Sequence, residues 1–179
     1  MWIKEAFEKE LFTELLWPAV AGNVLWSFFS IIVCTNGSGY DWARLLMLFF
    51  LLIYLILSWY RSKNLEHGCG SRIFDAIHLV TIIVFAIAIY NERSWIDLSL
   101  ASIFCITMLG HFFGVWKEPK DKPYHRKILA SVSLLGFLSS ICIFFCSPEQ
   151  TNPWSLVVTL GLVLVIWGVV RTIINKEQK

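Results

Sequence analysis

The sequence predicts an all-α membrane protein with six transmembrane helices, a short interfacial helix before them and both chain ends in the cytoplasm. Composition is the first observation behind this prediction, because 57% of the 179 residues are hydrophobic and only 16% are charged. Soluble domains are closer to half apolar and about a quarter charged. The other two observations are the spacing of the long apolar runs and the uneven placement of lysine and arginine.

Six apolar runs are long enough to cross a bilayer, which takes about 20 mostly apolar residues in a helix. The runs cover residues 17–34, 42–60, 73–90, 95–116, 128–146 and 154–171. None of them alternates between polar and apolar residues as the strands of a membrane barrel do, and a helix satisfies its own backbone in lipid. The short polar connections predict three consecutive helical hairpins in a single membrane domain, residues 1–179.

Residues 1–16 have a different pattern from the runs that follow. Apolar residues recur every four positions in residues 2–16, and lysine and glutamate fill the positions between them. This spacing predicts an amphipathic helix lying along the inner interface. Because the segment has more glutamate than lysine, it suits a protein partner better than an anionic lipid surface.

The placement of basic residues predicts the orientation. Of the 15 Lys and Arg residues, only Arg44 and Arg93 fall on the side opposite to the two chain ends. Cytoplasmic loops carry the excess of Lys and Arg, so both termini are expected inside, in the plasma (inner) membrane. The basic segment 117–127 is a second candidate surface for a cytoplasmic protein partner or for lipid headgroups. The net charge of +2 is too small to indicate nucleic-acid binding.

Five polar residues within the runs form the candidate functional site. Asp75 and His78 are three residues apart in the third run, and Thr107 and His111 are four apart in the fourth. Asn23 is expected at a similar level in the first run. Counted from the predicted helix ends, all five share one layer in the cytoplasmic third of the membrane.

Two interpretations of this layer stay open. Ionisable residues inside a membrane often mark proton or ion pathways, and a carboxylate beside an imidazole suits proton handling. Alternatively Asp75 pairs with Arg72, and His78 and His111 make structural hydrogen bonds between helices. No metal or other cofactor is expected, because the layer has no evident fourth ligand and the spacing of the histidines does not suit a metal.

Small residues predict where the helices pack. Gly110 and Gly114 form a GxxxG pattern in the fourth run, which allows close approach of another helix and suggests a homo-oligomer. Ser133, Gly136 and Ser140 give the fifth run a small-residue face. The second and sixth runs have few such features, so they are expected to face lipid. A disulfide between Cys34 and Cys146 stays open, since both are expected near the outer surface.

These features favour a transport or pore-type subunit that works as an oligomer or within a membrane complex. One alternative is an anchor that recruits a cytoplasmic effector through residues 2–16 and 117–127. Another is a membrane-embedded enzyme acting on lipid or peptide at the cytoplasmic face, although no hydrolase or nucleotide-binding signature is present.

Two resemblances bear on these alternatives. In size and in its basic, proline-containing loop, the chain resembles the six-span peptidases that process quorum-sensing propeptides, which would make His67 and Cys69 catalytic. Those enzymes place the cysteine farther after the histidine than this chain does. In size and topology it also resembles the substrate-binding subunits of vitamin transporters, but their Ala-x-x-x-Ala motif is missing.

Overall fold

The structure is a computed structural model that describes residues 11–34, 37–63, 69–91, 95–114, 123–146 and 152–177. These residues form six α-helices after a short π-helical segment, and none of them is in a strand. The elements are η1 (Leu11–Leu16), α2 (Trp17–Cys34), α3 (Gly39–Lys63), α4 (Cys69–Tyr90), α5 (Ile96–Phe112), α6 (Pro123–Cys146) and α7 (Pro153–Glu177). The prediction of an all-helical protein is confirmed.

Five of the described helices are long and apolar enough to cross a membrane, which fits an integral membrane protein. The exception is α5, whose 17 residues lie at the lower limit of roughly 17–25 for a span. The predicted fourth run ended at residue 116 and was too long. The helix ends earlier because Gly114 adopts a left-handed φ of 65°, and its amide donates to the carbonyl of His111 at 3.2 Å.

The first span begins earlier than predicted. Residues 11–16 continue directly into α2, and the candidate span covers Glu14–Cys34. The wider π-helical winding comes just before Pro18, whose ring nitrogen has no hydrogen to donate to the carbonyl one turn back. The candidate span thus takes in residues 14–16, which were predicted to belong to a separate interfacial helix, and residues 1–10 lie outside the described part of the chain.

Local features explain where three helices begin, two of them by a hydrogen bond. The Ser38 hydroxyl accepts from the Asp41 amide at 3.1 Å before α3, and the Asn152 side chain accepts from the Trp154 amide at 3.1 Å before α7. Both are N-terminal caps. Helix α6 starts at Pro123, a residue that favours the first helical turn. Residues 123–127, predicted as part of a basic loop, are therefore helical.

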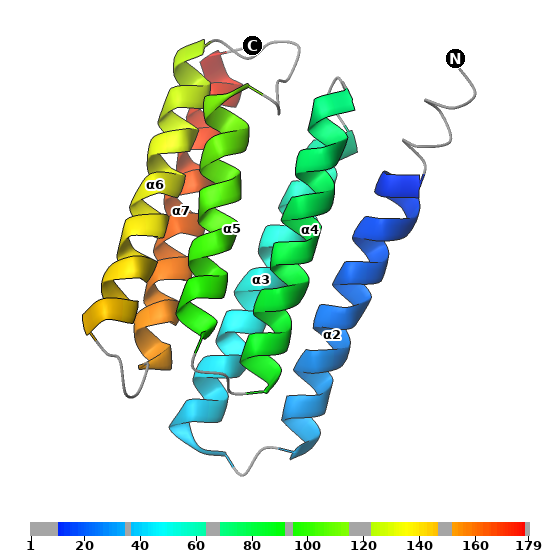
Figure 1. The fold of residues 1–179 in the computed structure, drawn as a ribbon, viewed down its shortest axis with the longest axis vertical. Helices are drawn as coiled ribbons and strands as arrows, with labels where there is room; N and C mark the ends of the chain where they lie inside the picture. The colour runs from blue at the N-terminus through cyan, green and yellow to red at the C-terminus, as the bar shows by residue number, and fades with distance from the viewer. Residues whose placement is uncertain are drawn as a thin grey trace.

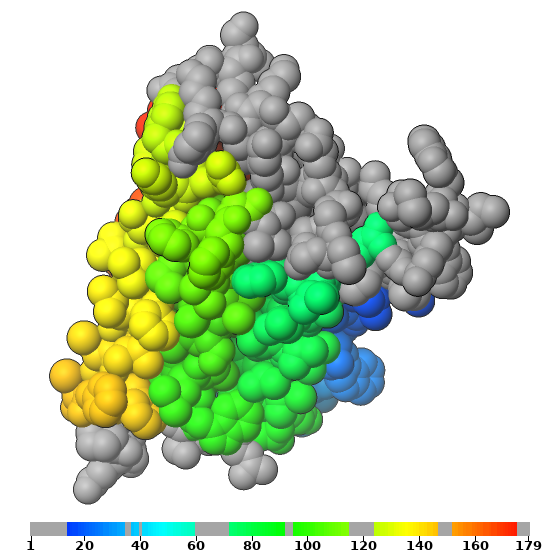
Figure 2. Space-filling view, turned by 45° about the horizontal axis from the view of Figure 1, so that its top comes forward, coloured from blue at the N-terminus to red at the C-terminus, as the bar shows by residue number. Residues whose placement is uncertain are grey.

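The six helices form a ring. Successive helices run in opposite directions, and the described start of the chain and the end of α7 lie at the same end of the bundle (Figure 1). The main contacts follow the order α2, α4, α5, α6, α7, α3 and back to α2. Helices α3 and α7 lie behind α4, α5 and α6 in Figure 1. Helix α2 lies at the edge, beside α4 (Figure 2).

The core is formed mainly by α3, α4 and α5. Ten of the 17 residues of α5 are buried. In the spans of α3 and α4 44% of the residues are buried, compared with 22% in the span of α7 and 28% in that of α2. The expectation that α7 faces lipid therefore agrees with its burial, whereas the same expectation for α3 is wrong. Helix α3 contributes a full apolar face, including Met47, Leu48 and Leu51, none of which is exposed.

The most extensive interface joins α5 to α6, which belong to two different predicted hairpins. Gly136 lies against the ring of Phe104, and a Cβ added to Gly136 would come within 2.9 Å of that ring. Ser133 and Ser140, both buried, donate to the carbonyls of Leu129 and Gly136 in their own helix. The small-residue face of α6 thus lets the bulky Phe104 approach closely.

Candidate functional site

Tyr54 lies at the centre of a buried polar contact between three helices. Its hydroxyl is 2.9 Å from Nε2 of His78 in α4 and 2.8 Å from Oγ1 of Thr107 in α5. The phenol and the imidazole are also stacked, with ring centroids 5.5 Å apart and an angle of 11° between the planes. All three residues are buried, so these hydrogen bonds replace contacts with solvent.

The direction of the hydrogen bonds in this cluster can be assigned. The single hydroxyl hydrogen of Thr107 is donated to the carbonyl of Ile103 at 2.8 Å. Thr107 must therefore accept from Tyr54, and Tyr54 must accept from Nε2–H of His78, because each hydroxyl donates once. A neutral His78 consequently carries its proton on Nε2, which leaves Nδ1 as the basic nitrogen.

Trp17 brings a fourth helix to the cluster. Its indole lies against the His78 ring, with the centroids 6.2 Å apart and the planes tilted by 47°. Trp17 is buried at the start of α2. His78 is thus held between an aromatic ring of α2 and another of α3.

Asp75 and His111 lie one helical turn from this cluster, toward the end of the bundle where the described chain starts. Asp75 precedes His78 by three residues in α4, and His111 follows Thr107 by four in α5, so each pair shares a helix face. Asp75 is 3% exposed and His111 is 1% exposed. We refer to Tyr54, Asp75, His78, Thr107 and His111 as the inner polar group. It combines a carboxyl, two imidazoles and two hydroxyls, which can all hold or pass a proton.

Asn23 does not belong to the inner polar group, and its assignment to the buried layer is wrong. The buried face of α2 consists of Trp17, Val20, Val24, Ser27 and Ile31. Asn23 is exposed, because it lies at the edge of this stripe and not within it. It also lies near the middle of the span Glu14–Cys34, since the helix begins before residue 17.

The predicted GxxxG pair is also separated by the structure. Gly110 is buried in α5, but Gly114 follows the helix in a turn. A Cβ at Gly114 would collide with the guanidinium of Arg126. Gly114 therefore ends α5 instead of packing against a second helix.

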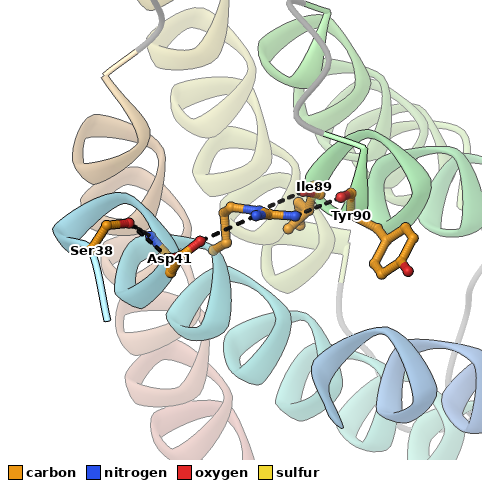
Figure 3. A network of polar contacts seen from close by, with 5 residues as sticks. Ser38, Asp41, Ile89 and Tyr90 are labelled. Atoms are coloured by element: carbon orange, nitrogen blue, oxygen red, sulfur yellow. Dashed lines mark hydrogen bonds and ion pairs between the residues drawn. The ribbon is translucent and has the colours of Figure 1, made fainter. Parts of the chain in front are cut away.

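A second polar cluster, at the opposite end of α3 and α4, was missed by the sequence analysis (Figure 3). Arg44 is 6% exposed. Its Nε donates to the carbonyl of Ile89 at 2.9 Å, and its Nη2 donates to the carbonyl of Tyr90. Its Nη1 lies 3.3 Å from Asp41, whose other carboxylate oxygen accepts from the Ser38 hydroxyl. We call Ser38, Asp41 and Arg44 the Arg44 clamp.

Other buried polar residues were missed as well. Asp97 is 1% exposed in the first turn of α5, and His125 is not exposed at all in α6. Tyr54 could have been found from spacing, because it lies three and seven residues after Leu51 and Met47 on one helix face. His125 could not, since it was assigned to a loop.

Metal binding and disulfide formation find no support in the described residues. They contain no group of three or more His, Cys, Asp or Glu residues placed to hold a metal ion. Cys34 and Cys146 are both free and exposed, so the disulfide left open between them is not formed.

Known proteins offer no family for this chain. No protein-family model, no curated protein and no solved structure matches it. Any function therefore has to be inferred from the helices and from the polar residues buried between them.

Proposed function

We propose that this chain is a six-span transport protein of the membrane and that its inner polar group carries protons or small cations. The observation behind this proposal is the contact of Tyr54 with His78 and Thr107, which joins three helices inside an apolar bundle. Ionisable side chains are expensive to bury in a membrane, so they are rare there unless they serve a function.

The order of groups supports proton handling. The assigned hydrogen bonds run from His78 through Tyr54 to Thr107 and leave Nδ1 of His78 as the atom that would take up a proton. Asp75 is one turn away on the same helix face and would stabilise the imidazolium that results. His111 occupies the corresponding place on α5, one turn from Thr107.

Transport through this bundle requires a movement of helices. The ring is filled by large side chains such as Phe85 and Phe104, which are almost completely buried. Two clefts of about 540 and 300 Å³ lie between α3 and α7 and between α2 and α3, and apolar residues line both. Neither cleft is lined by a residue of the inner polar group. An oligomer or a membrane complex would supply a partner against which helices can move.

The orientation completes the proposal. Both ends of the chain are expected in the cytoplasm of a cell whose plasma membrane holds the protein, because Lys and Arg concentrate on that side. Arg44, one of two exceptions, lies buried against Asp41 and helix carbonyls. It is therefore part of the bundle rather than of a charged outer loop.

The experiment is a flux measurement with the purified full chain in liposomes. A trapped pH-sensitive dye would report proton entry driven by a potassium diffusion potential, and replacement of protons by sodium or potassium would test the cations. We expect Tyr54→Phe and His78→Gln to reduce flux to the level of empty vesicles. Ser99→Ala is the matched control, because Ser99 is buried but bonds only to the Ile96 carbonyl of its own helix.

Two results would contradict the proposal. One is a wild-type flux no greater than that of empty vesicles for protons, sodium and potassium alike. The other is an unchanged flux in both Tyr54→Phe and His78→Gln, which would give the inner polar group a structural role.

A further inference from the structure

The exposed position of Asn23 sets α2 apart from the other helices. The candidate span covers Glu14–Cys34, and a rise of 1.5 Å per residue puts Asn23 about 14 Å from one end and about 16 Å from the other. The carboxamide therefore lies near the middle of a hydrocarbon core about 30 Å thick. Asn23 is exposed, and α2 itself lies at the edge of the bundle (Figure 2).

The Asn23 side chain makes no hydrogen bond with any described residue. Three other exposed polar side chains form a hydrogen bond within their own helix. Ser102, Ser131 and Thr172 each donate to the carbonyl four residues back in their own helix. An asparagine carboxamide has two donors and an acceptor, and lipid tails can satisfy none of them.

The neighbours of Asn23 on α2 are a small residue and a large exposed one. Gly22 lies at the cleft between α2 and α3, and no atom lies within 4 Å of an added Cβ there. Trp26, one turn further along, is 72% exposed, although tryptophan usually lies at the membrane interfaces instead of the centre. Small residues and polar side chains are both typical of contacts between transmembrane helices.

We propose that α2 packs against α2 of a second copy of this chain, with the two Asn23 side chains paired at the contact. Two carboxamides are complementary to each other, because the NH₂ group of each can donate to the oxygen of the other across a two-fold axis. A two-fold axis along the membrane normal keeps both copies in the same orientation, so the two Asn23 residues meet at one depth. This proposal names the partner that the proposed function left open, and it needs membrane insertion but no transport activity.

The dimer also places Cys34 of the two copies near each other. Cys34 follows Asn23 by eleven residues, which is about three helical turns, so both lie on the same side of α2. Cys34 is exposed and free. Helices that cross at about 20° would hold the two thiols within reach of a short bifunctional maleimide.

The experiment measures self-association of the full chain in liposomes by single-molecule photobleaching over a range of lipid-to-protein ratios. We expect two-step bleaching for the wild type that persists on dilution, and mostly single steps for Asn23→Leu. Asn23→Gln keeps the carboxamide and should retain the dimer. Ser102→Leu is the matched control, because Ser102 is exposed in a span but bonded within its own helix, and it should remain dimeric.

Crosslinking provides the second measurement, on a variant that keeps Cys34 and replaces the other four cysteines by serine. A crosslinked dimer that disappears with Asn23→Leu supports the proposal. A wild type that bleaches in single steps at every dilution overturns it. So does an Asn23→Leu variant that stays dimeric, whatever happens to transport. Because Asn23 contacts no described side chain through a hydrogen bond, Asn23→Leu should fold normally, which its thermal unfolding would verify.

Discussion

The inner polar group and the Arg44 clamp both join α3 to α4, but they do so with different chemistry. In the inner polar group, Tyr54 contacts His78 and Thr107 through side chains alone. In the clamp, the guanidinium of Arg44 bonds mainly to the backbone carbonyls at the end of α4 (Figure 3). The two lie ten residues apart in α3, which is about 15 Å along the helix.

Under the proposed function, this difference separates a structural cluster from one that handles protons. The last carbonyls of a helix lack partners within the helix and carry a partial negative charge, so a cation there is stabilising. An arginine also stays protonated at any accessible pH, and it therefore cannot pass a proton on. An imidazole, in contrast, is the side chain whose ordinary change of charge falls near neutral pH. A buried charge is thus the weaker indicator of function here, and a hydrogen-bonded histidine is the stronger one.

The largest effect is expected from Arg44→Leu, because it leaves two helix carbonyls and Asp41 without their cation. We expect the free energy of unfolding to fall by about 3–5 kcal/mol, measured by reversible unfolding in mixed micelles. Arg44→Lys keeps the positive charge but not the several N–H donors of the guanidinium. Its unfolding free energy should therefore lie between those of the wild type and Arg44→Leu. A loss of unfolding free energy below about 1 kcal/mol would show that the clamp is dispensable for the fold.

Tyr54→Phe should have a smaller effect on stability and a larger one on transport. Removal of the hydroxyl leaves the His78 N–H and the Thr107 oxygen without their partner, at a cost of about 1–3 kcal/mol. Tyr90→Phe is a suitable control, because the Tyr90 side chain is 45% exposed and only the backbone carbonyl of this residue contacts Arg44. If Tyr54→Phe unfolded as readily as Arg44→Leu while its folded fraction kept full flux, the functional contrast between the two ends would be lost.

Thr107→Val tests the end of the hydrogen-bond chain. The variant keeps the shape of the side chain but removes the oxygen that accepts from Tyr54, so we expect a loss of about 1 kcal/mol and a partial loss of flux. Ser140→Ala, which removes a buried hydroxyl bonded only within its own helix, should destabilise less and leave flux unchanged. If the two substitutions changed stability equally and also changed flux equally, the assigned direction of the hydrogen bonds from His78 to Thr107 would be contradicted.

The smallest effect is expected at the exposed edge of the clamp. Ser38→Ala removes the cap of α3 and the hydrogen bond to Asp41, which should lower the unfolding free energy by about 0.5–1 kcal/mol. Ser38→Asn keeps a capping oxygen and should restore most of it in the same unfolding measurement. A loss as large as that of Arg44→Leu would mean that Ser38 acts through Arg44 and not as a cap.

Much of the fold could be predicted because apolar runs and their polar connections are local properties of the sequence. Six spans were expected after an interfacial helix, and the described residues form six α-helices, five of them long and apolar enough to cross a membrane. Their ends were less predictable: α5 stops where Gly114 turns the chain, and α6 starts at Pro123 inside an expected loop. Which helices become neighbours was not predictable, since the packing of α5 on α6 depends on shape at Gly136 and Phe104.

The candidate site was predicted in part for the same reason. Spacing within a helix places Asp75 with His78 and Thr107 with His111, and all four are buried. Asn23 was misplaced because the side of a helix that faces its neighbours depends on tertiary packing, and α2 turns Val20 and Val24 inward instead. Tyr54 and Arg44 were underrated because hydrophobicity counts cannot show which polar groups meet across helices.

The contact of α3 with α7 has a consequence for biosynthesis. These two helices close the ring, with Phe50 of α3 lying against Gly161 of α7. Because α7 follows α4, α5 and α6 in the chain, the flank of α3 that meets Gly161 stays uncovered while those three helices are synthesised and inserted. The first helices therefore reach their final contacts only after α7 is made, and a stop codon placed ahead of α7 would leave an open bundle for the cell's proteases to remove.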